Sequence, residues 1–421
     1  MKVIIIGNGV AGNTASSTVR HLDSRADITI ISEEIYPEYT ACAFPHYLAG
    51  EFRRQKLFLK TKKDYSRERI KTIFGQKVIR VSPEEKKVFF DTKSLAYDKL
   101  VIATGSKPLM LPLKGVNLNG VFTLKSLDDA DQIFNYTGKT AVIIGSGPIG
   151  TETSVALAKR GLRVYLVESL DRIMPRVFDE RPASLLRDIL EEQGIKVLTG
   201  EMVTSIIGNG SVGGIVTDKQ HIKCDMVILS AGMKPNVELA QKSGLNIGTL
   251  GGISVTQQMM TSSRDVYAGG DCVETEDIIT GRQTLSLLWH NAKRQGEVIG
   301  YNCCGVPKSY PGSVNITSLD IFGINAASFG RVEAEVSRCK DIEIIERHGG
   351  ENYCRLILYQ ERLIGAQSIG NARDMGALLF ALIGRHNLNE IKQVIGRRAF
   401  LPLSPWCYRV ARYIAPMTSK G

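Results

Sequence analysis

The sequence lacks the cysteine patterns that mark metal sites and redox disulfides. Its eight cysteines form no CxxC pair and no cluster with any of the six histidines, which argues against zinc and iron–sulfur sites. No two cysteines have the CxxxxC spacing of a redox disulfide. Long hydrophobic runs are also absent, because the longest late stretch, residues 375–384, is about half of what a membrane span needs. We therefore expect a soluble, cytoplasmic protein without a membrane span, whose cysteines are mostly reduced.

The chain has a net positive charge but no recognition motif for nucleic acid. The chain has 53 basic and 43 acidic residues, a net charge of +10. Such a charge can attract phosphate-rich ligands or an acidic protein. No nucleic-acid-binding motif accompanies it, so no nucleic-acid partner is expected. The length of 421 residues predicts two or three domains, and the 41 glycines predict many tight turns.

An internal repeat is the strongest feature of the sequence. Residues 2–34 and 140–169 each contain a β-branched run, a glycine-rich turn, a helical stretch and a second apolar run. Each copy ends near an acidic residue. This pattern predicts a βαβ unit, present twice, and a GxGxxG turn framed in this way is typical of dinucleotide binding. The sequence thus predicts two Rossmann-like α/β domains.

Each glycine position has a distinct physical task. The first permits the tight turn after the strand, the second lets the backbone approach a pyrophosphate, and the third permits close packing of helix on strand. The following helix offers free N–H groups to the phosphates. The residues are Gly7, Gly9 and Gly12 in the first copy, and Gly145, Gly147 and Gly150 in the second.

The acidic residues that end the repeats are candidates for binding ribose hydroxyls. Ser32 stands where such an acid often ends the second strand, and we assign the role in the first copy to Glu33, with Glu34 as its rival. Glu168 ends the second copy. Its carboxylate would repel a 2′-phosphate, which predicts a preference for NAD(H) over NADP(H), although Arg172 lies close by.

The remaining segments suggest the domain boundaries. Strands that end in small residues recur at 100–108 and 226–235, and a third, at 264–274, ends in glycines and an aspartate. After about residue 306, alternating strands precede helices, which predicts a separate α+β domain. We expect a first domain over 1–110 and 245–305, a second over 111–244, and a C-terminal interface domain over 306–421.

With these motifs in place, residues 1 to about 400 resemble the two-dinucleotide flavoproteins, the pyridine-nucleotide–disulfide oxidoreductase family. The resemblance implies that the first motif binds FAD, the second binds NAD(H), and hydride passes between the two. It further implies FAD contacts from the ATG segment, the GGD segment and the start of a late helix, and nucleotide contacts beyond the second glycine turn. These residues are Ala103, Thr104, Gly105, Gly270, Asp271, Leu288 and Ala292 for FAD, and Glu152 and Gly232 for NAD.

The segment around Cys42 suggests the branch of the family. In YPEYTACAFPHYL a single cysteine precedes a predicted helix, similar to coenzyme A-disulfide reductases and NADH oxidases. This resemblance implies a thiol beside the flavin with a lowered pKa, which we take as the candidate catalytic residue. The histidine that NADH peroxidases and water-forming oxidases carry after the first turn is replaced by Val10–Ala11. His46 is interpreted as structural.

The resemblance leaves the electron acceptor open. GNGVAG, SEEIYPEY and residues 354–379 are closer to rubredoxin reductases and the flavin part of nitrite reductases. One hypothesis is reduction of a small disulfide or persulfide through Cys42. The alternative is an electron-transfer subunit that serves an acidic ferredoxin-type partner, as in a 2-oxoacid or phenylglyoxylate dehydrogenase; NADH oxidase activity is a third. A homodimer or a larger complex is expected, and the tail from residue 385, with seven basic residues against Glu390, is a candidate docking element.

Overall fold

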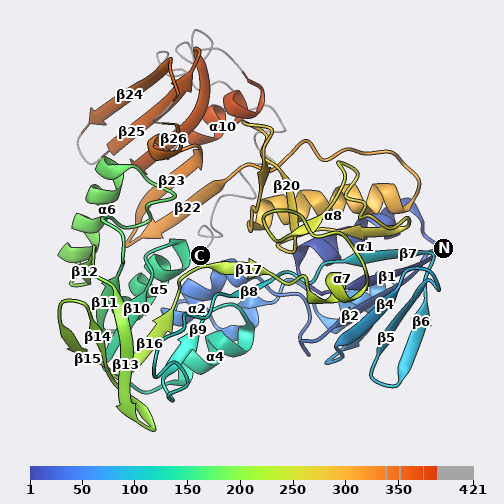
Figure 1. Cartoon of the computed structure of the whole chain (residues 1–421), viewed down its shortest axis with the longest axis horizontal. Coiled ribbons are helices and arrows are strands. Elements are labelled where there is room, and N and C mark those ends of the chain that lie inside the picture. The colour runs from blue at the N-terminus through green and yellow to red at the C-terminus, as the bar shows by residue number, and fades with distance from the viewer. Residues whose placement is uncertain (337–338, 350–351, 373, 386–421) are drawn as a thin grey trace. The chain divides into compact units, whose positions relative to one another are not determined.

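In the computed structural model, which describes residues 1–336, 339–349, 352–372 and 374–385, the chain forms two compact units (Figure 1). The first contains residues 1–43, 52–107 and 233–314, and the second contains residues 44–51, 108–232 and 315 onward. No helix in the described part of the chain is long and apolar enough to cross a membrane. The basic tail beyond residue 385 lies outside the described residues. The domain boundaries expected from the sequence stay a prediction.

The first unit is built on a parallel sheet in the order β19-β7-β1-β2-β3. Val3 and Ile5 in the central strand have no exposed surface. A parallel sheet covered on both faces needs apolar residues at every position, which explains the unbroken run of β-branched residues. The predicted βαβ unit is confirmed by β1, α1 and β2. The sheet strands and this helix are β1 (Lys2–Ile6), α1 (Val10–Leu22), β2 (Asp27–Ser32), β3 (Ile70–Phe74), β7 (Lys99–Ile102) and β19 (Val266–Ala268).

Short helices, a three-stranded meander and small ribbons complete this unit. They are η1 (Ala41–Ala43), η2 (Arg54–Leu57), α3 (Lys62–Arg67), β4 (Val78–Ser82), β5 (Lys87–Phe90), β6 (Lys93–Ala96), β8 (Ser106–Pro108), β17 (Met233–Pro235), α7 (Glu238–Lys242), β18 (Ile253–Ser254), β20 (Val273–Glu276), β21 (Gln283–Thr284) and α8 (Trp289–Cys303).

Helices α1 and α8 lie side by side, and their backbones approach each other closely (Figure 1). A Cβ atom added at Gly296 would lie 2.4 Å from the carbonyl oxygen of Ala11, and one at Gly300 would lie 2.4 Å from Cβ of Thr18. Only glycine allows two helices to approach so closely. The sequence pattern alone did not single out these two glycines, because their role depends on a helix almost 300 residues away.

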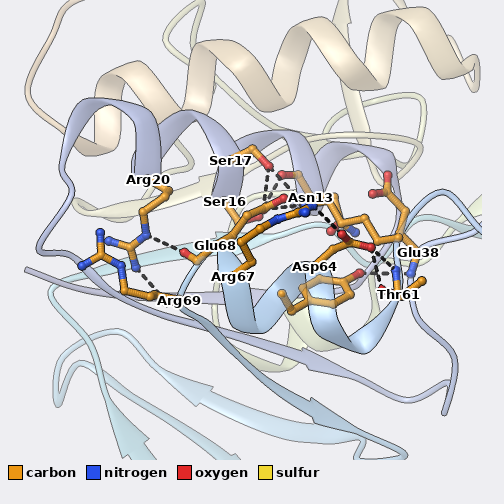
Figure 2. Close-up of polar contacts among 12 residues, drawn as sticks. Asn13, Ser16, Ser17, Arg20, Glu38, Thr61, Asp64, Arg67, Glu68 and Arg69 are labelled. Atoms are coloured by element: carbon orange, nitrogen blue, oxygen red, sulfur yellow. Dashed lines mark hydrogen bonds and ion pairs between the residues drawn. The ribbon is translucent and has the colours of Figure 1, made fainter.

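A polar network fastens α3 to α1 (Figure 2). The guanidinium of Arg20 donates to the backbone carbonyls of Glu68 and Arg69, each over 2.8 Å, and Nζ of Lys60 lies 2.7 Å from the Glu68 carboxylate. Helix α3 begins with a capping box, in which Thr61 and Asp64 satisfy each other's backbone donors. These contacts fix α3 against the first βαβ unit.

The second unit repeats the Rossmann-like arrangement. Its parallel sheet has the order β12-β11-β10-β16-β9, so β10 and β11 correspond to β1 and β2. The predicted fold class, two Rossmann-like folds, is confirmed. The elements of this part are α2 (Phe44–Leu48), β9 (Val121–Thr123), α4 (Leu127–Asn135), β10 (Thr140–Ile144), α5 (Pro148–Lys159), β11 (Arg163–Val167), α6 (Glu180–Glu192), β12 (Lys196–Leu198), β13 (Val203–Asn209), β14 (Ser211–Thr217), β15 (His221–Lys223) and β16 (Met226–Leu229).

The C-terminal α+β part belongs to the same unit. Its antiparallel sheet has the order β22-β23-β26-β25-β24, and α10 packs against β26. It consists of β22 (Ile316–Ile321), β23 (Ile324–Gly330), α9 (Glu333–Val336), β24 (Ile342–Gly349), β25 (Asn352–Tyr359), β26 (Arg362–Gly370) and α10 (Met375–Ile383). The sheet also contacts α5 and α6 through β22 and β26, so it is packed directly on the second Rossmann-like fold.

Replacing Gly296 by Ala should destabilise the first unit by about 1–3 kcal/mol, because the methyl group would overlap the Ala11 carbonyl. Hydrogen exchange of α1 and α8 amides under increasing urea measures the free energy of unfolding of this unit. Gly376→Ala in α10 is the matched control: its Cβ would meet nothing within 4 Å, so that change should be neutral or slightly stabilising. Equal effects of the two substitutions would contradict the packing argument.

Candidate functional site

The first glycine turn is shaped by backbone contacts. Gly7 has φ +111°, and a Cβ there would lie 2.1 Å from the carbonyl oxygen of Ala103, while one at Gly12 would lie 2.2 Å from the Gly7 oxygen. At Gly9, the N-cap of α1, a Cβ would meet nothing within 4 Å, and no side chain caps the helix. The turn therefore leaves open space in front of uncapped N–H groups, which suits a pyrophosphate.

Three segments far apart in the sequence meet at this turn. Ala11, Ala103 and Ala292 form one buried cluster, from α1, the end of β7 and the first turn of α8. Gly270, with φ +86°, also lies here, since a Cβ on it would be 3.2 Å from Cβ of Ala11. Leu288 is the N-cap of α8. The structure thus brings the ATG segment, the GGD segment and the late helix together, and their contact with FAD stays a prediction.

Side chains that the sequence did not single out hold these segments. The Ser106 hydroxyl donates to Asp271 over 2.7 Å, and the buried Gln295 amide oxygen accepts from Gly270 N over 2.7 Å. Asn236 makes three hydrogen bonds to Thr104 and Gly105. Its side-chain Nδ2 donates to the Thr104 oxygen, and its backbone N donates to the Gly105 oxygen. Its backbone oxygen accepts from the Thr104 hydroxyl. The Thr104 hydroxyl is therefore engaged with the protein. Gly105 has φ +68° and open space at its Cβ position.

The strand register bears on the first ribose acid. Ile6 pairs with Ile31, and Ile144 pairs with Val167, so Ser32 is the counterpart of Glu168. Ser32 is buried, whereas Glu33 is exposed and pairs with Lys77 over 3.0 Å. Glu33 lies one residue beyond the structural equivalent of Glu168. Its assignment to the ribose of the first dinucleotide stays a prediction.

The second glycine turn reproduces the first. Gly145 has φ +103° and would clash through a Cβ with the Ser230 oxygen at 2.4 Å, as Gly7 does with Ala103. A Cβ at Gly150 would lie 2.0 Å from the Gly145 oxygen. Gly147, the N-cap of α5, and Gly232, with φ +115°, both have open space at their Cβ positions. This turn therefore presents a second cradle of the same design.

Glu168 is held by four donors. Its Oε2 accepts from the backbone N and the hydroxyl of Ser146 over 3.0 and 2.6 Å. Its Oε1 accepts from Leu170 N over 3.0 Å and from the Ser169 hydroxyl over 3.3 Å. The nearby Arg172 lies 3.1 Å from Asp171, which neutralises it locally. An acidic group is therefore fixed at the carboxyl end of β11.

Glu152 lies on a face of α5 that lines a small pocket. The pocket wall also includes Asp320 from β22, His46 from α2, and Lys159, further along α5. Burial, and secondarily the nearby Asp320, raises the pKa of Glu152 to about 8, which favours the neutral form of its carboxyl. His46 Nδ1 lies 2.6 Å from one carboxylate oxygen of Glu51, and the other oxygen of that carboxylate pairs with Lys159.

Cys42 is an exposed thiol in η1. In contrast, burial raises the pKa of the thiols of Cys224, Cys272, Cys303, Cys304 and Cys354. These five groups stay protonated and weakly nucleophilic at neutral pH. Cys339 is exposed as well, and Cys407 lies outside the described residues. The vicinal pair at 303 and 304 therefore has no reactive thiolate.

The segment before Cys42 is tied to the first glycine turn. The Tyr65 hydroxyl accepts from Glu38 N over 3.0 Å and donates to Asn8 Oδ1 over 2.9 Å, and Asn8 in turn accepts from Asn13. Figure 2 shows Asn13 and Glu38 in this network. Burial raises the pKa of Glu38 to about 7, although Lys60 opposes the shift. Sequence reasoning missed Glu38 and Tyr65, whose contacts depend on a neighbouring helix.

Substituting Gly9 by Val should abolish flavin retention while leaving the fold intact. The protein itself leaves that space open, so the valine side chain would occupy the room a pyrophosphate needs without a clash in the apoprotein. Flavin absorbance per chain after gel filtration measures this. Gly147→Val is the reciprocal control, expected to keep the flavin and weaken NADH binding. Full flavin content in folded Gly9→Val would refute the assignment of the first turn.

Comparison with known proteins agrees with this geometry. Residues 1–296 match the family described as pyridine nucleotide-disulphide oxidoreductase. The chain is 34% identical to an NADH oxidase of Methanocaldococcus jannaschii, over 89% of this chain and 88% of that protein. It is 33% identical to an NAD(P)H coenzyme A polysulfide/persulfide reductase of Pyrococcus horikoshii, over 79% and 76%.

A solved structure extends the likeness to the whole fold. The NAD-dependent persulfide reductase from A. fulgidus superposes with a TM-score of 0.91 at 29% identity, covering 98% of this chain and 83% of that one. The two glycine cradles, one in each unit, are the features that the family's two dinucleotides require. The chain belongs to the pyridine nucleotide-disulphide oxidoreductase family and is an FAD-dependent oxidoreductase that uses a nicotinamide dinucleotide.

Proposed function

We propose that this protein is an NADH-dependent reductase of small persulfides or disulfides that acts through Cys42. The observation that carries the proposal is the contrast among the thiols. Cys42 is exposed on a short helical turn in the unit with the first dinucleotide cradle, while burial raises the pKa of five other thiols. The likeness to two persulfide reductases supports the same substrate class.

The chemistry asks for one nucleophilic sulfur on the protein. The Cys42 thiolate would attack a disulfide R–S–S–R to form a mixed disulfide with release of R–SH. On a persulfide R–S–S–H it would attack the inner sulfur, which forms the same mixed disulfide with release of H₂S. Overall, NADH, a proton and R–S–S–H yield NAD⁺, R–SH and H₂S. Bound FAD supplies the passage of two electrons from the nicotinamide to sulfur. No CxxxxC partner is present in the sequence, so the second thiol must come from the substrate.

The roles of the other residues follow from their placement. Gly7, Gly9 and Gly12 would hold the FAD pyrophosphate, with Asp271, positioned by Ser106, on the ribityl chain. Gly145, Gly147 and Gly150 would hold the pyrophosphate of NADH, and Glu168 its adenosine ribose. Glu152, whose pKa is raised to about 8, would lie near the contact between nicotinamide and flavin and, in its neutral form, could donate a hydrogen bond there.

An iron–sulfur protein and molecular oxygen are the competing acceptors. The basic tail that would attract an acidic partner lies outside the described residues, so no contact of the described residues favours that partner over a small sulfur compound. Flavin-to-iron transfer needs proximity and driving force but no thiol. The state of Cys42 therefore separates the sulfur chemistry from both competitors.

The enzyme should prefer NADH to NADPH by about a hundredfold in kcat/KM, because Glu168 repels a 2′-phosphate. Replacing Glu168 by Ala should bring the two coenzymes within about tenfold, since the freed donors of Ser146 and Leu170 can then bind the phosphate. Stopped-flow reduction of the flavin with each coenzyme measures this. Glu192→Ala, an exposed acid on α6, is the control and should leave the ratio unchanged. An unaltered ratio in Glu168→Ala would remove Glu168 from the coenzyme site.

Replacing Cys42 by Ser should leave flavin reduction by NADH within about twofold of the parent. Turnover with coenzyme A persulfide or disulfide should fall more than about a hundredfold, because a hydroxyl does not attack sulfur at neutral pH. Cys339→Ser, the change of another exposed thiol, should retain full turnover. Parental sulfur reductase activity in Cys42→Ser would reject the proposal. Loss of sulfur turnover with retained viologen reduction would support it.

A further inference from the structure

Ser146, the residue between the first two glycines of the second turn, is a buried hub. It has no exposed surface, and it donates to Glu168 through both its backbone N and its hydroxyl. The hydroxyl also accepts from Met174 N over 3.1 Å, and its backbone oxygen accepts from the Thr151 hydroxyl over 3.0 Å. The position of the Glu168 carboxylate therefore depends on the Ser146 hydroxyl, which in turn depends on Met174.

Met174 is held in an uncommon backbone conformation. It has φ +44°, the left-handed region that an L-residue with a side chain enters at a cost in free energy, and only 1% of its surface is exposed. Its oxygen accepts from Val177 N and Phe178 N over 2.8 and 3.0 Å, which closes a tight turn. Such a conformation persists only where the surroundings enforce it.

The segment that follows Met174 is bonded to the C-terminal sheet. Ser328 on β23 donates to the Val177 oxygen over 2.6 Å. The side-chain amide of Gln367 on β26 accepts from Asp179 N and donates to Asp179 Oδ2, over 2.9 and 2.7 Å. Arg355 on β25 places Nε 3.1 Å from the same carboxylate. Gln367 is fully buried, and Asp179 is 3% exposed.

The Asp179 side chain does not cap its own helix and instead makes these tertiary contacts. It is the N-cap of α6, a position where an aspartate ordinarily accepts from the first turn of its own helix, yet it makes no such bond. Its other oxygen accepts from Glu333 N of α9 over 2.8 Å. Both carboxylate oxygens thus face the C-terminal part of the chain, so the start of α6 is a tertiary latch.

We infer that the C-terminal sheet positions the coenzyme-binding carboxylate. The path runs from Gln367, Arg355 and Ser328 through Asp179 and the Met174 turn to Ser146 and Glu168, and its contacts are hydrogen bonds and ion pairs within the second unit. Ser146 and Asp179 are positioning residues that set the affinity for NADH and its discrimination from NADPH. The inference rests on the proposed role of Glu168 at the ribose.

The test compares Ser146→Ala and Asp179→Asn with the parent enzyme in its FAD-loaded form. Ser146→Ala removes one donor and keeps the backbone bond, so the KM for NADH should rise about tenfold while kcat stays within about twofold. Asp179→Asn keeps the size of the side chain but weakens its pairing with Arg355, and should raise that KM about threefold. In both variants, the ratio of kcat/KM for NADH to kcat/KM for NADPH should fall by the same factor by which the KM for NADH rises.

Asp188→Asn is the matched control, since Asp188 is an exposed aspartate on the same helix. Its kinetics should equal those of the parent. If Asp179→Asn fails to fold, Ser328→Ala, which deletes only one hydroxyl contact to the turn, takes its place with the same expected shift. A merely structural role would lower thermal stability without changing the coenzyme ratio, and that result would overturn the inference.

Glu168→Ala separates this inference from the proposed function. If that variant keeps the parental NADH affinity, the role assigned to Glu168 fails, and the inference falls with it. If it loses NADH affinity while Ser146→Ala, Asp179→Asn and Ser328→Ala keep the parental coenzyme ratio, the positioning path alone is rejected. A loss of NADH affinity that is largest in Glu168→Ala, smaller in Ser146→Ala and smallest in Asp179→Asn supports both the proposed function and the positioning path.

Discussion

Each half of the molecule depends on one contact between backbones. At Gly7 the chain passes so close to the Ala103 carbonyl that no side chain fits between them, and Gly145 repeats this against Ser230. The contact sets where the helix after each turn, α1 or α5, begins, and hence where its unpaired N–H groups point. Two residues further on, the Cβ positions of Gly9 and Gly147 are open. The shape of both glycine turns is therefore a property of chain packing before it is a property of any side chain.

The electrostatic features of the site are set by burial more than by charge. The +10 net charge of the chain suggested partners, yet the groups whose behaviour changes most are buried. The pKa of Glu152 is raised to about 8 because its carboxyl is desolvated next to Asp320, and the inner cysteines are kept as thiols by the same loss of solvent.

Reasoning from the sequence found the features that short local motifs encode. The glycine turns, the two βαβ units and Glu168 all follow from short motifs, and the structure brings Ala103, Gly270 and Ala292 together as the family resemblance implied. It could not find Asn236, Gln295 or Ser146, because their roles arise from hydrogen bonds to segments distant in the chain. Its assignment of the first ribose to Glu33, with Glu34 as the rival, stays a prediction, and strand register makes Ser32 the counterpart of Glu168.

The latch at Asp179 bears on how the chain can be divided. A fragment limited to residues 108–232 would keep both strands of the second βαβ unit but lose Gln367, Arg355 and Ser328. Freed from these, Asp179 could turn back and cap α6, a local exchange that stabilises a helix by about 1 kcal/mol. The Met174 turn would then keep its bonds to Ser146 but lose those to the C-terminal sheet. Residues 108–232 are thus not a portable module, and recombination between relatives would preserve the contacts around Glu168 only if both pieces were exchanged together.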